Sequence, residues 1–242
     1  MLISVMGPVL VAAQTSQTQP LIGFSWYTKK IPFYLQTVSA PGADQGVLDA
    51  MQIWVQSQEW FISTYENGQS APYEFVQVDQ ATATSSGIVI TFNQTQTSAH
   101  VWNTNYQYYL NSSGDFSRIT VTNSIILTFT DGSPLSLTNF RASALQQLGV
   151  GLGLDFTTFS TSDLMNQNEQ NVLSPSTLNL YALYLLSKTI SHNSQPFSPV
   201  SLPSGIPYSA APAVPVPEFA TPSIMVMLMV GLSLLVIRRR RS

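Results

Sequence analysis

Residues Gln146–Phe156 read QQLGVGLGLDF, and this stretch is the most informative part of the chain. The residues before it predict a helix from about Ser136 to Leu148. Glycines at 149, 151 and 153 follow, and glycine adopts positive φ without strain where a chain reverses. One interpretation is therefore a helix end with a glycine-rich turn. A phosphate-binding loop fits less well, since the spacing and the preceding strand of a dinucleotide fingerprint are missing.

The segments around this stretch predict a mixture of strands and helices. Apolar residues recur at three- and four-residue steps from Gly46 to Tyr65, which is typical of an amphipathic helix. A further helix is expected from Ser174 as N-cap, with Pro175 in its first turn, to Lys188. Residues 102–109 (WNTNYQYY) favour an amphipathic edge strand or loop over an aromatic ligand platform. The expected strands are residues 31–38, 73–78, 87–92, 117–122 and 124–130, the last two separated at Asn123.

The stretch at 146–156 resembles the zinc motif of the metzincin peptidases. That family carries H-E-x-x-H-x-x-G-x-x-H, in which two histidines one helical turn apart bind zinc and the glutamate activates water. A glycine then turns the chain toward the third histidine. In the matrixin branch the usual sequence of this motif is close to HELGHALGLGH. The matching positions in this chain are Leu148, Gly149, Leu152, Gly153 and Leu154.

The resemblance to matrixins spans about Trp26–Ser191. The expected elements follow the family order, beginning with a strand and a long helix that contains a tryptophan. Residues 162–165 (SDLM) resemble the methionine turn that lies under the zinc, with Met165 as its methionine. Pro175–Leu186 resembles the closing helix. The implied fold is of the α+β class, a metzincin-like mixed β-sheet packed with about three helices in an extracellular domain of residues 14–195.

Every catalytic position departs from the family. Gln146, Val150 and Phe156 stand where the three histidines belong, and Gln147 replaces the glutamate. Valine and phenylalanine offer no ligand atom, and a glutamine amide neither carries a negative charge nor accepts a proton near neutral pH. We therefore expect no catalytic residue and no metal ligand among them, and no cofactor, although the resemblance implies zinc for active members.

An alternative is an active peptidase with atypical zinc ligands, for which Asp155, Asp163 and His100 are candidates. The only histidines are His100 and His192, and surface positions are expected for both because neither lies in a cluster. The chain has no cysteine, which excludes a disulfide framework, a thiolate zinc site and a cysteine nucleophile. No G-x-S-x-G elbow indicates a serine hydrolase.

Charge argues against nucleic-acid binding. Only 9% of the 242 residues are charged, well below the roughly 25% typical of soluble domains. Four of the nine basic residues are Arg238–Arg241, so the rest of the chain carries five basic against twelve acidic residues. DNA and RNA binding relies on clustered Lys and Arg, which this body lacks.

The C-terminal residues predict a membrane anchor. Residues 220–237 are uncharged and, as a helix, reach across about 27 Å of hydrocarbon. Arg238–Arg241 follow directly, and such residues stay preferentially on the cytoplasmic side. The expected protein is therefore single-pass in the cell membrane, with an extracellular body and a basic cytoplasmic tail at 238–242.

Three further segments resemble processing signals or linkers. Pro217-Glu218-Phe219 precedes the span and resembles the PEF sorting signal of archaeal surface proteins, which implies processing by an archaeosortase-like enzyme. Residues 1–13 are interpreted as a truncated signal peptide or as a chance apolar run. Seven of the fifteen prolines lie between Pro196 and Pro217, so residues 196–219 are expected to form a semi-rigid stalk.

Together these patterns predict a membrane-anchored archaeal cell-surface protein with a degenerate, non-catalytic matrixin-like domain. The cleft that aligns a peptide against a sheet edge needs no metal, so binding of peptides or surface-layer proteins by strand addition is the expected role. The alternatives are the active peptidase with atypical ligands and a purely structural envelope protein.

Overall fold

A computed structural model describes residues 17–26, 28–37, 43–68, 70–93, 101–110, 116–128, 137–167, 172–188 and 198–214. Over these ranges the fold is of the α+β class, as predicted. The helices are α1 (Ala43–Tyr65), α2 (Gln80–Ser86), α3 (Leu137–Gly151) and α4 (Thr177–Lys188). The strands are β1 (Thr18–Gln19), β2 (Lys30–Leu35), β3 (Glu74–Gln77), β4 (Ile88–Asn93), β5 (Val101–Leu110), β6 (Phe116–Thr128) and β7 (Val200–Ser201).

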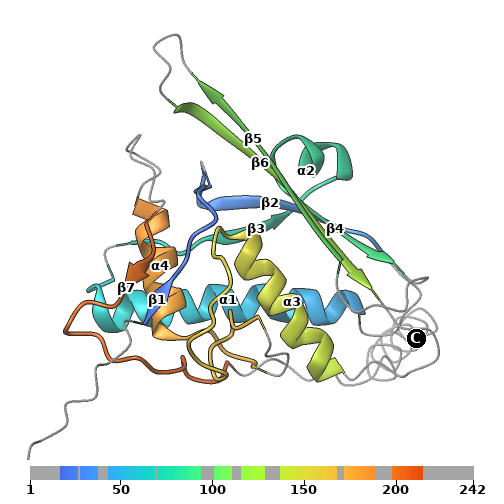
Figure 1. The fold of residues 1–242 in the computed structure, drawn as a ribbon. Helices are drawn as coiled ribbons and strands as arrows, with labels where there is room; N and C mark the ends of the chain where they lie inside the picture. The colour runs from blue at the N-terminus through green and yellow to red at the C-terminus, as the bar shows by residue number, and fades with distance from the viewer. Residues whose placement is uncertain are drawn as a thin grey trace, which may run out of the picture.

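Five strands form the main sheet in the order β3-β2-β4-β6-β5 (Figure 1). β3, β2, β4 and β6 run parallel to one another, whereas β5 is antiparallel to β6. Parallel neighbours need a crossover, which α1 supplies between β2 and β3. The segment with α2 then leads from β3 past β2 to β4, on the other side of β2. β5 lies at one edge of the sheet, so the edge strand expected for residues 102–109 is confirmed.

Two expectations about these elements were wrong. The strands predicted on either side of Asn123 are one strand, β6, because Asn123 pairs with Ile88 on one side and with Thr104 on the other. The expectation of about three helices missed α2, which lies in a segment rich in Thr and Ser. Asp79 caps this helix by accepting a 2.9 Å hydrogen bond from the backbone N–H of Thr82.

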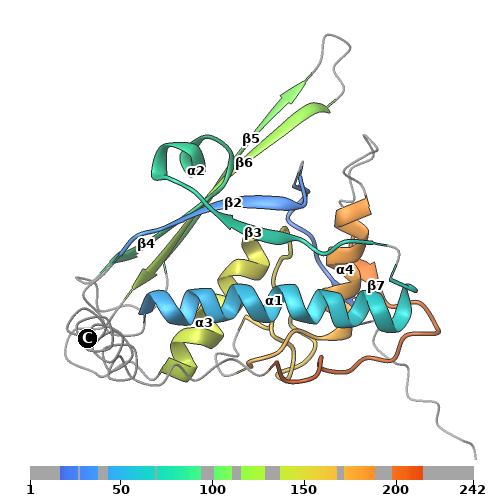
Figure 2. The same cartoon turned by 180° about the vertical axis from the view of Figure 1, so that it is seen from behind.

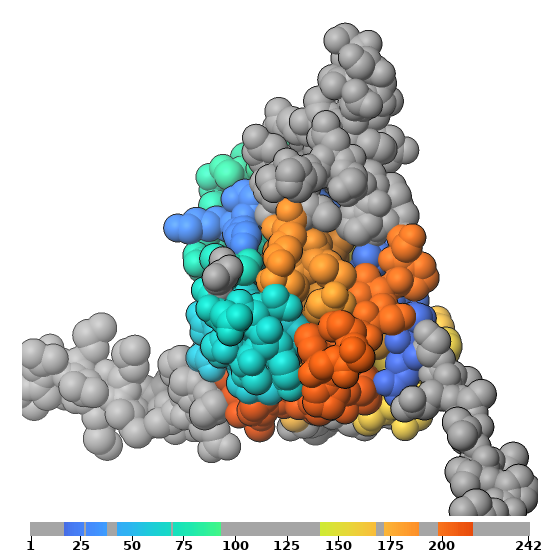
Figure 3. Space-filling view, turned by 90° about the vertical axis from the view of Figure 1, so that its left-hand side faces the viewer, coloured from blue at the N-terminus to red at the C-terminus, as the bar shows by residue number. Residues whose placement is uncertain are grey.

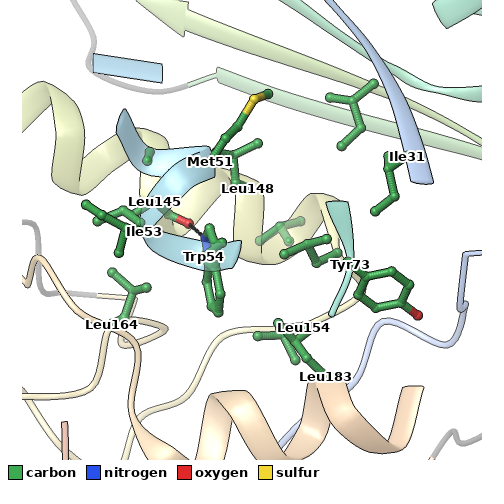
Figure 4. Packing of buried hydrophobic residues seen from close by; sticks show 14 of the residues in the cluster. Ile31, Met51, Ile53, Trp54, Tyr73, Leu145, Leu148, Leu154, Leu164 and Leu183 are labelled. Carbon is green, nitrogen blue, oxygen red and sulfur yellow. Dashed lines mark hydrogen bonds between the residues drawn. The ribbon is translucent and has the colours of Figure 1, made fainter. Parts of the chain in front are cut away.

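The helices α1, α3 and α4 lie on one side of the sheet and α2 lies on the other (Figures 1 and 2). Between the sheet and the three helices is a core in which Trp54 of α1 is the largest fully buried side chain. Its indole Nε1 donates to the carbonyl of Leu145 on α3 at 2.8 Å (Figure 4). This bond and the packing around it fix how α1 and α3 cross.

Residues 198–214, here called the C-terminal strap, lie against the domain. β7 within the strap pairs antiparallel with β1, and Val200 is buried. Further along, the N–H of Ala211 donates to Pro175 O at 2.8 Å. Figure 3 shows the strap in deep orange beside α4 and the end of α1. The predicted free stalk from Pro196 is therefore wrong for residues 198–214, and the folded domain continues past 195.

The strap also changes where α4 begins. The expected N-cap at Ser174 is wrong, because Ser174 and Pro175 run alongside the strap instead of entering the helix. The helix starts at Thr177 and is capped by a reciprocal pair. The N–H of Ser176 donates to Asn179 Oδ1 at 2.9 Å, and the N–H of Asn179 donates to Ser176 Oγ at 3.2 Å.

No helix within the described ranges is both long and apolar enough to cross a membrane. The predicted span at 220–237 lies outside those ranges. So do residues 1–13, the triplet Pro217-Glu218-Phe219 and the basic tail.

Candidate functional site

The candidate site begins on the last two turns of α3, which carry Gln146, Gln147 and Val150. Gln146 and Val150 are four residues apart and share one face of the helix, as the sequence predicts. Their side chains are buried, with exposed fractions of 9% and 6%. From the four-residue spacing we expect both side chains to point into one shallow cleft. This expectation is wrong, because the protein itself covers both side chains.

Gln146 links α3 to the loop that contains Met165. Its Nε2 donates to Asn166 O at 2.7 Å and to Leu164 O at 3.1 Å. Both carbonyls flank Met165, so the amide occupies the space between helix and loop. A glutamine at this position acts as a cross-link within the domain.

Met165 lies directly beneath the same part of α3. It is fully buried, and its sulfur is so close to Gly149 that a Cβ on this glycine would lie 2.5 Å from Sδ. The same Cβ would lie 3.0 Å from the indole of Trp54. A residue without a side chain at 149 is therefore what allows Met165 to pack against the helix.

After α3 the chain reverses at Gly153, which has φ +106°. The reversal satisfies the last helical carbonyls: the N–H of Gly153 donates to Val150 O at 2.9 Å and that of Leu154 to Gly149 O at 3.1 Å. The glycine-rich helix end predicted for this stretch is confirmed. Trp26 closes the same end by donating from its indole to Gly151 O at 2.8 Å.

Substituting Gly153 by alanine is expected to lower the free energy of unfolding by about 1–3 kcal/mol. The φ angle is unfavourable for any side chain, and the new Cβ would lie 2.9 Å from the carbonyl oxygen of Phe24. Chemical denaturation measures the change. Gly205→Ala is the matched control, because its Cβ would meet nothing within 4 Å, and an equal loss in both variants would contradict this explanation.

Phe156 follows the turn and is half-buried against the core. The next residue, Thr157, forms a bridge with Asn166, and its N–H donates to Met165 O at 2.8 Å. Because Gln146 donates to the carbonyl of the same Asn166, Gln146 and the segment after the turn meet at one loop. Gln146 and Thr157, the residue after Phe156, thus contact the same loop.

Within the same loop, Asp163 is a fully buried carboxylate with many donors around it. Charged groups are buried only where partners compensate the loss of water. Its donors are Ser176 Oγ at 2.7 Å, the Met165 N–H at 2.8 Å, Asn179 Nδ2 at 3.1 Å, Tyr208 Oη at 3.1 Å and Thr157 Oγ1 at 3.4 Å. These donors come from the loop, α4 and the strap, so Asp163 ties three segments together.

The same network reaches the N-terminal segment through Gln19, which is also fully buried. Its Oε1 accepts from Asn179 Nδ2 at 2.7 Å, and its Nε2 donates to Asp155 O at 2.6 Å. No sequence pattern indicates Gln19 or Tyr208, since neither belongs to a motif. Only the fold brings them to Asp163.

The pKa of Tyr208 is affected by its place in this network. Burial raises its pKa from an ordinary value of 10.0 to about 12, and the adjacent Asp163 carboxylate adds to the shift. The folded protein therefore holds the phenolic proton more tightly than the unfolded chain. The resulting stabilisation is complete below pH 10 and is lost as the pH rises toward 12.

The variant Tyr208→Phe is expected to lose stability less steeply between pH 10 and pH 12 than the parent. Part of the slope remains, because burial also raises the pKa of Tyr73. At neutral pH the variant lacks the hydrogen bond to Asp163, at a cost of about 1 kcal/mol. Denaturation at a series of pH values tests both effects, and identical slopes for variant and parent would show that Tyr208 does not titrate in this window.

The alternative zinc ligands are not brought together in the described ranges. Asp155 is exposed and accepts from the N–H of Phe156, whereas the oxygens of Asp163 are used within the network. His100 and His192 lie outside those ranges. Among the described residues no group of three or more His, Cys, Asp and Glu could hold a metal ion.

The sequence matches no protein-family model and no curated protein.

Proposed function

We propose that this chain is a membrane-anchored cell-surface protein whose body is a matrixin-like domain without catalytic zinc, and that it binds peptides by strand addition at β5. The observation that carries the proposal is the meeting of α3, the Gly153 turn and the Met165 loop at one place. A metzincin-like fold accounts for the order of elements along the chain and for the single antiparallel strand at the sheet edge.

The side chains at this place support a binding role over a catalytic one. Gln146 donates to two backbone carbonyls, which leaves its amide nitrogen engaged inside the domain. Val150 is buried and has no donor atom. Gln147, at the position of the family's glutamate, is also buried and is not a base near neutral pH. A domain with these groups has no means of activating water at this position.

The free edge of β5 supports strand addition. Nine of its ten residues pair with β6 in continuous register before a shift at Tyr109 and Leu110. On its other side β5 pairs with no strand among the described residues. Main-chain groups on such an edge bind an extended peptide without any contribution from a metal.

The catalytic half of the proposal is tested by metal analysis of the purified full chain together with a broad peptide-cleavage assay. We expect no stoichiometric zinc and no hydrolysis. Stoichiometric zinc with hydrolysis that a chelator abolishes would contradict the proposal and favour a peptidase with atypical ligands.

The binding half is tested with an immobilised library of extended peptides. A subset is expected to bind, and N-methylation of alternate backbone amides should abolish binding in one register only, because every second N–H of an added strand faces the sheet edge. Binding that tolerates methylation in both registers would contradict strand addition. An absence of any bound peptide would favour the structural envelope protein.

The anchor is tested by deleting residues 218–242. Loss of the chain from the membrane fraction is expected, because the deletion removes the uncharged span and the arginines that follow it. The full chain carried through the same fractionation is the control. Retention of the truncated chain in the membrane would contradict anchoring by the C-terminal helix.

A further inference from the structure

We propose that the C-terminal strap holds the domain directly on the lipid bilayer, with Leu173 and the exposed strap residues Ala210, Pro212 and Ala213 facing the membrane surface. This inference rests on the proposed membrane anchor at residues 220–237. It specifies which face of the domain contacts the lipid. The domain is then in contact with the membrane surface and is not separated from it by a stalk.

The first argument is the length of chain between the domain and the span. A free spacer of residues 196–219 would reach up to about 80 Å when fully extended. The strap reduces this length, because Ala211 is buried and hydrogen-bonded and Val214 packs against the core. Five residues then remain before Ala220, with a reach of about 17 Å.

The second argument compares this reach with the size of the domain. A domain of this length has a radius of gyration of about 16 Å, so its diameter exceeds the reach of five residues. The bilayer can therefore be approached only by the side of the domain where the strap ends. In Figures 1 and 2 the strap and α2 lie on opposite sides of the domain.

The end of the strap is held at several points. Ala210 forms a bridge with Ser176, and the hydroxyl of Ser174 donates to Ala211 O at 2.8 Å. Before these contacts, Tyr208 donates to the buried carboxylate of Asp163 and packs its ring against Phe159. Backbone and side-chain contacts thus oppose detachment of the strap, and its end stays on the domain.

The third argument is the chemistry of the surface at that point. Neither Val172–Pro175 nor Ala210–Val214 contains a charged residue. Leu173 has an exposed fraction of 37%, which makes it one of three large apolar side chains exposed among the described residues. Pro212 and Ala213 are also exposed, and they directly follow Ala211, whose carbonyl accepts from the hydroxyl of Ser174. An uncharged apolar surface is suited to the boundary between lipid headgroups and acyl chains.

The experiment uses site-specific fluorescence in the full chain. The protein contains no cysteine, so Leu173→Cys and Ala81→Cys each give one labelling site. Ala81 is the matched control, because it is exposed on α2 on the far side of the domain. Each variant carries an environment-sensitive dye and is placed in phosphatidylcholine vesicles that contain some lipid with a nitroxide on its headgroup.

Quenching by the nitroxide lipid is expected to be several times stronger at 173 than at 81. Equally weak quenching at both positions, in chains that resist carbonate extraction, would overturn the membrane contact and leave the anchor standing. Extraction of the chain by carbonate would overturn the anchor and the inference together. A blue-shifted but unquenched dye at 173 would assign the surface to a second copy of the chain, and this would also overturn the inference.

A second variant tests the role of the short tether. Insertion of a long flexible Gly-Ser linker between Val214 and Pro215 should reduce quenching at 173 to the level found at 81, while the domain and the span stay unchanged. Quenching that persists at its original strength would overturn the claim that tether length sets the contact.

Discussion

Substitution of Asp163 by alanine is expected to lower the free energy of unfolding by about 3–5 kcal/mol, since several buried donors each lose their acceptor at about 1–3 kcal/mol when unsatisfied. The carboxylate is fully buried, and its removal leaves donors from the loop, α4 and the strap without their acceptor. Such a loss approaches the whole stability of many domains. Urea denaturation followed by circular dichroism measures it, provided that the variant folds.

The milder variant Asp163→Asn keeps the shape of the side chain, so it remains informative if the alanine variant does not fold. It replaces one acceptor oxygen by an NH₂ group that faces other donors, and we expect a loss of about 2 kcal/mol. Asp155→Asn is the matched control, because this exposed residue lies eight positions away and its change should stay within about 0.5 kcal/mol. Equal effects at the two aspartates would contradict a central role for the buried network.

The combined changes Gln146→His, Val150→His and Phe156→His are expected to create a zinc site with a water in the fourth position. Two positions share one face of α3, and the third follows the Gly153 turn directly before Thr157, which bridges to the loop that Gln146 contacts. Without metal the variant should be less stable than the parent, since the two hydrogen bonds of Gln146 are lost. Zinc at about 100 times its dissociation constant should restore about 2.7 kcal/mol.

Calorimetry and thermal denaturation with and without zinc measure this gain. The variant with only Gln146→His and Phe156→His is the control, because two ligands should bind zinc much more weakly than three. Hydrolysis would additionally need Gln147→Glu. A folded triple variant with no more zinc affinity than the parent would mean that Phe156 is not positioned across from α3, and this result would remove the main support for a matrixin-like fold.

The sequence predicted the regular elements with clear periodicity. The helix expected at 46–65 corresponds to α1, and the alternating segment at 87–92 corresponds to β4. The break predicted at Asn123 was wrong. The low strand propensity of asparagine is a property of the residue in isolation, whereas backbone pairing with both neighbouring strands keeps Asn123 within β6. The short helix α2 was missed because its signal is only a capping aspartate before Thr and Ser.

The strap could not be recognised from composition. Proline favours extended backbone, and an extended segment has the same sequence signature whether it is solvated or lies along a folded surface. The residues that hold it, such as Thr177 and Asp163, lie in other parts of the chain. Their contact depends on the tertiary fold, which no local pattern reveals.

The sequence predicted the spacing of the candidate site residues but not that they are buried. The four-residue step from Gln146 to Val150 correctly placed both on one face of α3. It could not indicate that the Met165 loop covers this face, since the loop is held by Asp163 and by the bonds of Gln146 itself. Whether a helix face lines a cleft or an interior depends on residues distant in the sequence.

The pairing of β1 with β7 has a consequence for the order in which the parts of the protein fold during synthesis. Thr18 and Gln19 meet Ser201 and Val200, so the first described strand finds its partner only after nearly all of the domain has been synthesised. Contacts of such long sequence separation close late in folding because of their entropy cost. Gln19 likewise lacks its partner Asn179 until α4 has been synthesised, and in this interval the early residues can pair with other strand edges.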